Sequence, residues 1–115
     1  MKIRFQRGSV RFRLRQGEVR TLVGMGRAEE SVAIGNEVLV HSLVLHAGPP
    51  GLAIEGAGLV ARVPVEDARA WATGTEVGLR YELTGGTRLL VEKDWACLEP
   101  AAGDGDDDTF PRPGT

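Results

Sequence analysis

The chain has 115 residues, an apolar fraction of 42% and a formal net charge of −2, which are ordinary values for one small globular domain. A single cysteine excludes an internal disulfide, and no apolar run approaches the roughly 18 residues that cross a membrane. The first ten residues also lack the apolar core of a secretory signal, so we expect a cytoplasmic protein with no membrane partner.

The first half of the chain shows two kinds of periodicity. Charged and apolar residues alternate in four segments, as in half-buried strands, and Val19 and Leu22 share one face of a short helical segment. Gly24 and Gly26 can end that helix, because glycine tolerates the left-handed conformation. These patterns predict strands at 2–6, 10–14, 28–34 and 38–46, and a helix at 16–23.

The second half repeats this plan after a Gly- and Pro-rich segment at 47–51. Residues 2–34 align without a gap with residues 51–83, and apolar positions coincide, as in the pairs Phe5–Ile54 and Leu14–Val63. The predicted elements of this half are strands at 52–55, 59–63, 77–83 and 87–95, and a helix at 65–72. We therefore divide one domain, 1–98, into repeat one (1–47) and repeat two (50–98).

The predicted fold class is α+β. A duplicated strand-strand-helix-strand-strand unit gives about eight antiparallel strands and two short helices. A two-faced sheet of this length twists strongly, so we expect a curled sheet or a barrel.

Charge is distributed unevenly along the sequence. Residues 1–27 contain eight bases and one acid, whereas residues 99–115 contain five acids and one base. The segment 99–115 has few large apolar residues, so it is predicted to be an acidic, flexible tail. Its alternate aspartates begin at Asp104 but do not match a calcium loop, which needs glycine at the position that Thr109 occupies.

Arginines recur on the polar side of the predicted strands. If the sheet curls with this side inward, their guanidinium groups converge and bind phosphate or carboxylate through paired hydrogen bonds. The alternative is a solvated face on which Arg–Glu pairs form across the strands. A pI near 5.7 and only six aromatic residues disfavour nucleic acid as the partner. The candidate ligand-binding residues are Arg4, Arg11, Arg13, Arg62, Arg80 and Arg88.

Signals for catalysis are sparse. Glu92 and Asp94 lie on one side of the last predicted strand and are weak candidates for metal ligands. Cys97 has no histidine or second cysteine near it, which favours a buried structural thiol over a metal or redox site. No cofactor is predicted.

Both ends of the sequence carry a resemblance to a known family. The residues concerned are Met1-Lys2-Ile3-Arg4 at the start, and Val91 to Leu98 with the following acidic stretch and Phe110-Pro111 at the end. They resemble a family of small bacterial proteins of uncharacterised function. This resemblance covers nearly the whole chain, implies a bacterial source and implies no activity.

At the level of the fold alone, the doubled unit is similar to triphosphate-tunnel (CYTH) enzymes. That resemblance implies a wide antiparallel barrel in which Arg, Lys and Glu bind triphosphate. The Glu-x-Glu-x-Lys motif of those enzymes is absent, because the first strand reads Lys2-Ile3-Arg4-Phe5-Gln6. Fold similarity by itself does not carry an activity.

We therefore expect a non-enzymatic binding module that recognises a phosphate-containing or acidic ligand, or a protein partner, through its arginine-rich face. The first alternative is a Mg²⁺-dependent phosphohydrolase in which Glu92 and Asp94 hold the metal and the arginines hold phosphates. A further alternative is a structural subunit that joins an assembly through exposed strand edges. The sequence leaves open the oligomeric state, the ligand and whether the acidic tail folds onto the basic hairpin.

Overall fold

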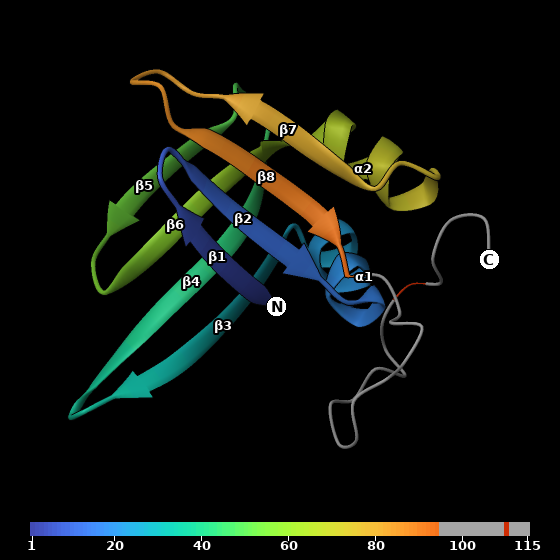
Figure 1. The fold of residues 1–115 in the computed structure, drawn as a ribbon. Helices are drawn as coiled ribbons and strands as arrows, with labels where there is room; N and C mark the ends of the chain where they lie inside the picture. The colour runs from blue at the N-terminus through green and yellow to red at the C-terminus, as the bar shows by residue number, and fades with distance from the viewer. Residues whose placement is uncertain (95–109, 111–115) are drawn as a thin grey trace, which may run out of the picture.

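The computed structural model describes residues 1–94 and Phe110. Two helices and eight strands follow one another in the order shown in Figure 1. The strands are β1 (Lys2–Gln6), β2 (Ser9–Leu14), β3 (Arg27–Ile34), β4 (Glu37–His46), β5 (Gly51–Glu55), β6 (Gly58–Pro64), β7 (Gly78–Glu82) and β8 (Arg88–Lys93). The helices are α1 (Gln16–Met25) and α2 (Val65–Thr73), and neither is long and apolar enough to cross a membrane.

Local chemistry sets the ends of both helices. At the start of α1, a carboxylate oxygen of Glu18 accepts a hydrogen bond from the Arg15 backbone N–H at 2.9 Å. Gly26 ends α1 with a φ of 80°, a left-handed conformation that glycine adopts without a steric penalty. Pro64 precedes α2, whose first turn carries Glu66 and Asp67 near the positive end of the helix dipole.

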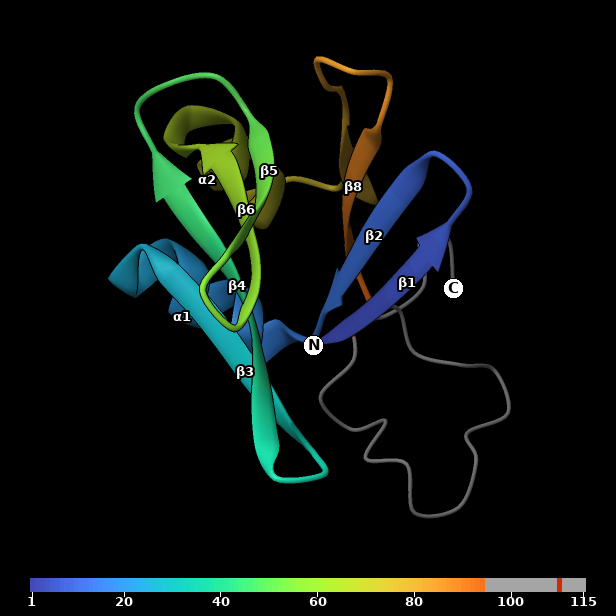
Figure 2. The same ribbon diagram turned by 90° about the vertical axis from the view of Figure 1, so that its left-hand side faces the viewer.

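The strands form two separate four-stranded sheets. Sheet A has the order β1-β2-β8-β7, and sheet B has the order β3-β4-β6-β5. The outer pairs are antiparallel hairpins, but the central pairs, β2 with β8 and β4 with β6, are parallel. Figure 2 shows the two sheets side by side, with sheet B on the left and sheet A on the right.

This arrangement confirms an α+β fold with eight strands and two helices, and it corrects two details of the prediction. The strands are not all antiparallel, and they do not curl into one sheet or close into a barrel. The physical reason is the helices, because α1 carries the chain from sheet A to sheet B and α2 carries it back. The division into repeats at 1–47 and 50–98 remains a prediction.

The core lies between the inner faces of the two sheets. Phe12 and Val91 from sheet A and Leu43 from sheet B are completely buried there. The helices pack together at one end of the sheets, and their buried residues Leu22 and Trp71 complete the same core (Figure 1). In sheet A, the central strands β2 and β8 bury alternate residues and present the residues between them on the outer face of the sheet.

Several predictions concern residues outside the described part of the chain. The acidic tail at 99–115 lies there except for Phe110, as does Cys97. Phe110 donates a backbone hydrogen bond to the carbonyl oxygen of Asp94 at 2.7 Å. Its ring centroid lies 5.5 Å from the Nζ atom of Lys93.

Candidate functional site

The outer face of sheet A collects basic side chains from all four of its strands. The register pairs Arg4 with Arg11 across β1 and β2, and the same row continues through Leu90 to Arg80. Residues directly opposite each other in a sheet point to the same side, so these arginines share one surface. The basic face is defined here by the cations on that surface: Lys2, Arg4, Arg11, Arg13, Arg80 and Arg88.

Sheet A thus brings together five of the six arginines that the sequence singles out as ligand-binding candidates. Arg62 is the exception, because it lies on β6 in sheet B and forms an ion pair with Glu55 at 2.8 Å. Its strand parity matches that of the others, but the β5–β6 hairpin that carries it belongs to sheet B. Lys2 also lies on this surface, although it is not among the candidate ligand-binding residues. The alternation of Lys2 with the apolar Ile3 indicates that Lys2 points to the same face as Arg4.

Acidic side chains balance this surface only in part. The outer positions of the four strands include two acids, Glu82 and Glu92. The Oε1 atom of Glu92 lies 3.5 Å from Nε of Arg11 and 3.6 Å from Nε of Arg13, so one carboxylate serves two guanidinium groups. Within the described residues, Nε of Arg11 is buried and has no hydrogen-bond partner. The basic face therefore keeps an excess of positive charge and one unsatisfied donor.

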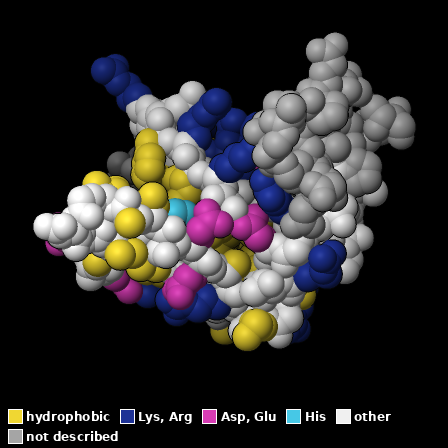
Figure 3. All heavy atoms as spheres, turned by 90° about the horizontal axis from the view of Figure 1, so that it is seen from below, with side chains coloured by type: hydrophobic (Ala, Val, Ile, Leu, Met, Phe, Trp, Pro, Cys, Tyr) yellow, Lys and Arg dark blue, Asp and Glu magenta, His cyan; other side chains and the backbone are white. Residues whose placement is uncertain are grey.

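A hollow lies at the β1–β2 end of the basic face. Its volume is about 210 Å³, and its lining includes Lys2, Arg4, Arg11 and Arg13. Cationic groups around a hollow of this kind are suited to an oxyanion, because planar guanidinium groups donate paired hydrogen bonds. Figure 3 shows Lys and Arg side chains crowded together on one part of the surface, apart from the exposed hydrophobic side chains at the left.

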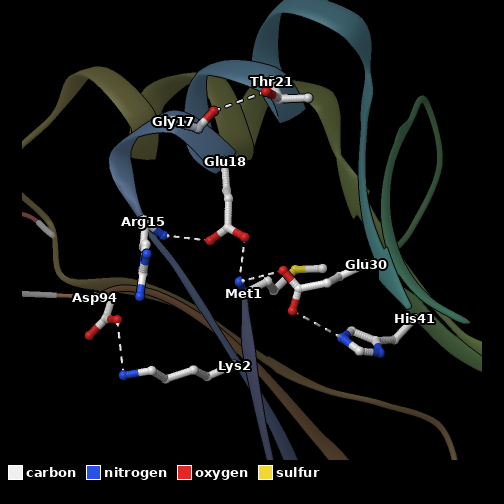
Figure 4. Close-up of polar contacts among 9 residues, drawn as sticks. All are labelled: Met1, Lys2, Arg15, Gly17, Glu18, Thr21, Glu30, His41 and Asp94. Carbon is white, nitrogen blue, oxygen red and sulfur yellow. Dashed lines mark hydrogen bonds and ion pairs between the residues drawn. The ribbon is translucent and has the colours of Figure 1, made fainter. Parts of the chain in front are cut away.

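A second polar cluster surrounds the first residue of the chain (Figure 4). The amino group of Met1 forms ion pairs with Glu18 and, at 3.1 Å, with Glu30. The other oxygen of Glu30 lies 3.9 Å from Nε2 of His41. These contacts join β1 to α1, β3 and β4. The sequence does not predict this cluster, because its members are far apart in the chain and form no motif.

The two candidate metal ligands have cationic neighbours. Glu92 lies between Arg11 and Arg13, and Asp94, which is buried, lies 3.5 Å from Nζ of Lys2. In the part of the chain that the structure describes, no group of three or more His, Cys, Asp or Glu side chains is placed to hold a metal ion. The arrangement gives these two carboxylates the role of counter-charges to the basic face.

Comparisons with known proteins assign the chain to a sequence family. The model of a family of unknown function (DUF7009) matches residues 1–114. No curated protein and no solved structure matches the chain, so the resemblance to triphosphate-tunnel enzymes has no support from these comparisons.

Proposed function

This chain belongs to DUF7009, a family of unknown function, and from its own residues we propose that it binds an anionic partner through the basic face. The observation that carries this proposal is the excess of positive charge on the outer face of sheet A, where six cations face three carboxylates, those of Glu82, Glu92 and, beside Lys2, Asp94. The chemistry favours a phosphate-bearing ligand, since arginine matches the geometry of phosphate oxygens with two parallel donors.

The unsatisfied donor of Arg11 supports the same proposal. A buried N–H group without an acceptor costs free energy, and a bound oxyanion would supply that acceptor. The donor belongs to a side chain that lines the hollow beside Lys2, Arg4 and Arg13. An anion seated there would therefore meet several positive charges together with a donor that lies 3.5 Å from the Glu92 carboxylate without forming a hydrogen bond.

The contrast between the two sheets gives a further argument. We infer that the two halves of the chain are copies of one unit, and three features support this inference. Each sheet joins one hairpin from each half through a parallel central pair. The helices occur at the same place in each half. Matched positions are also buried in both halves: Phe12 with Ala61, Leu14 with Val63, Val19 with Ala68, and Leu22 with Trp71.

At the positions that match Arg4 and Arg11, sheet B carries Ala53 and Val60. A sheet of the same design therefore forms without these two arginines. Formation of the sheet alone does not account for Arg4 and Arg11, and the proposed binding of an anion does.

This contrast also supplies the experiment. The double variant Arg4→Ala/Arg11→Val gives sheet A the side chains that sheet B has at the matched positions. A matched control, Arg20→Ala/Arg69→Ala, removes the same charge from exposed positions on the two helices. Binding of phosphate, pyrophosphate, tripolyphosphate and ATP is measured by calorimetry and by the shift in melting temperature at low salt.

We expect wild type and the helix control to bind at least one of these anions. The sheet variant should bind it at least about tenfold more weakly while keeping its melting temperature in the absence of ligand. Equal binding by the sheet variant and wild type would overturn the proposal, and so would the absence of binding to wild type by all four probes and by an acidic peptide.

A further inference from the structure

The tip of the β3–β4 hairpin projects as an arm that no other described element covers on either face. Every residue from 29 to 39, the segment that we define as the arm, is exposed. Its side chains nevertheless include Val32, Ile34, Val38 and Leu39, and Ile34 is 60% exposed. Figure 1 shows this hairpin extending away from the helices at the lower left, and Figure 3 shows exposed hydrophobic side chains over it. The register places Val32, Ile34 and Leu39 on one face of the hairpin and Val38 on the other. Apolar side chains that share an exposed face in this way mark a site of interaction.

An apolar groove runs beside the arm. The arm contributes Ile34, Val38 and Leu39 to its lining, and the β5–β6 hairpin and β1 contribute Ile54 and Phe5. The groove has a volume of about 470 Å³, and residues 56–58, which are Gly-Ala-Gly, leave part of its wall without large side chains. Phe5 is 66% exposed and Ile54 is 85% exposed, so the groove is open to a bulky occupant along its length.

We propose that two copies of this chain associate about a two-fold axis, each placing its arm in the groove of the other. Both the apolar projection and the apolar recess occur on one chain, which is the requirement of a self-complementary contact. On the arm, Val32, Ile34 and Leu39 share one exposed face, and in the groove Phe5 and Ile54 are each more than half exposed, so both sides of the contact present apolar surface that a second copy would cover. A small molecule would leave most of this surface in water.

Charges at the rim fit the same pairing. Glu37 lines the groove at the end of the arm, and Arg7 lies in the β1–β2 turn, two residues after Phe5. Neither side chain has an ion-pair partner among the described residues of its own chain. We expect the Glu37 of each copy to face the Arg7 of the other in this dimer. The interface uses the arm and the groove edge, so it is independent of the basic face.

The test is the oligomeric state of the full chain, measured by sedimentation velocity and by light scattering after gel filtration. Wild type should be dimeric at about 10–100 µM, as is typical of interfaces of this size. Val38→Lys in the arm and Ile54→Lys in the groove should each give monomers with an unchanged circular dichroism spectrum. Met25→Lys, at a residue that is 81% exposed near the end of α1, is the matched control and should remain dimeric.

A charge exchange tests the pairing itself. Arg7→Glu and Glu37→Arg should each weaken the dimer by about tenfold or more, and the double variant should restore it, because the pair is rebuilt across the interface. A monomeric wild type at 100 µM would overturn the proposal. A dimer that survives both Val38→Lys and Ile54→Lys would also overturn it, since the contact would then lie elsewhere.

Discussion

The Oε1 atom of Glu92 stands within 3.6 Å of the Nε atoms of both Arg11 and Arg13. Because this carboxylate is shared by two cations, it reduces the positive potential where the hollow on the basic face opens. The two ion pairs are partly exposed and their atoms are 3.5–3.6 Å apart, and pairs of this kind contribute little to stability. We therefore expect the effect of Glu92 on a bound anion to outweigh its effect on the fold.

Glu92→Gln should therefore strengthen the binding of tripolyphosphate by about three- to tenfold at low salt, with little change in melting temperature. Calorimetry at two salt concentrations checks this, since the gain should shrink as salt screens the charge. Glu66→Gln, at an exposed position on α2, is the control for a general change in net charge. Weaker binding by Glu92→Gln would contradict the role given to this carboxylate.

Gly58→Ala should destabilise the protein by about 2 kcal/mol or more. A Cβ atom at Gly58 would lie 1.6 Å from the carbonyl oxygen of Val40, so the backbone of the β4–β6 pair would have to move. Gly51→Ala is the control, because a Cβ atom there meets nothing within 4 Å, and it should change the free energy of unfolding by less than about 0.5 kcal/mol. Urea unfolding of both variants decides the matter, and equal midpoints would contradict the geometry.

Tyr81 should remain protonated at pH 10, where an ordinary tyrosine is half ionised. Burial, the hydrogen bond from its hydroxyl to Asp67 at 2.9 Å and the charge of Asp67 all raise the pKa of Tyr81 above its usual value of 10.0. Because Tyr81 is the sole tyrosine of the chain, its ionisation can be followed directly by ultraviolet absorbance at 295 nm.

The sign of the linked effect follows from the raised pKa. The unfolded chain releases the tyrosine proton near pH 10, whereas the folded protein retains it, so the stability from this group is lost as pH rises above that value. Asp67→Asn should bring the absorbance titration to lower pH. An unchanged titration in this variant would rule out Asp67 as a cause of the shift.

Glu18→Gln should lower the free energy of unfolding by about 1–2 kcal/mol. The Glu18 carboxylate accepts the Arg15 backbone N–H at the start of α1 and pairs with the amino group of Met1, and glutamine removes the charge from both contacts. Urea unfolding measures the loss, with Glu66→Gln as the control in the first turn of the other helix. If both variants lost the same free energy of unfolding, Glu18 would stabilise the protein only as any acid near the start of a helix does.

Periodicity predicted the elements well because it depends on local sequence. The predicted helices at 16–23 and 65–72 differ from α1 and α2 by at most two residues at their ends. Strand parity likewise placed five arginines on one side. The parity of a residue along its strand does not indicate which strands are neighbours. For this reason Arg62 was grouped with arginines of the other sheet, and the parallel pairing of the central strands was not predicted.

The arm shows a second limit of the same reasoning. Val32 and Ile34 on β3 and Leu39 on β4 share one face of the hairpin, as the apolar residues of a half-buried strand pair do, yet the structure leaves them exposed. An apolar pattern in the sequence predicts a surface that is buried. It does not indicate whether that surface is buried by the same chain or by another molecule.

The parallel pairing of β2 with β8 has a consequence for the order in which the protein can fold. The residue partners Ser9 and Arg88 come from opposite ends of the described chain, so β2 has one open edge until almost all of the sequence has been synthesised. A central contact between residues so distant in sequence raises the contact order and slows folding. On the ribosome, the basic N-terminal hairpin emerges long before its permanent neighbour and must remain soluble alone, which its exposed arginines favour.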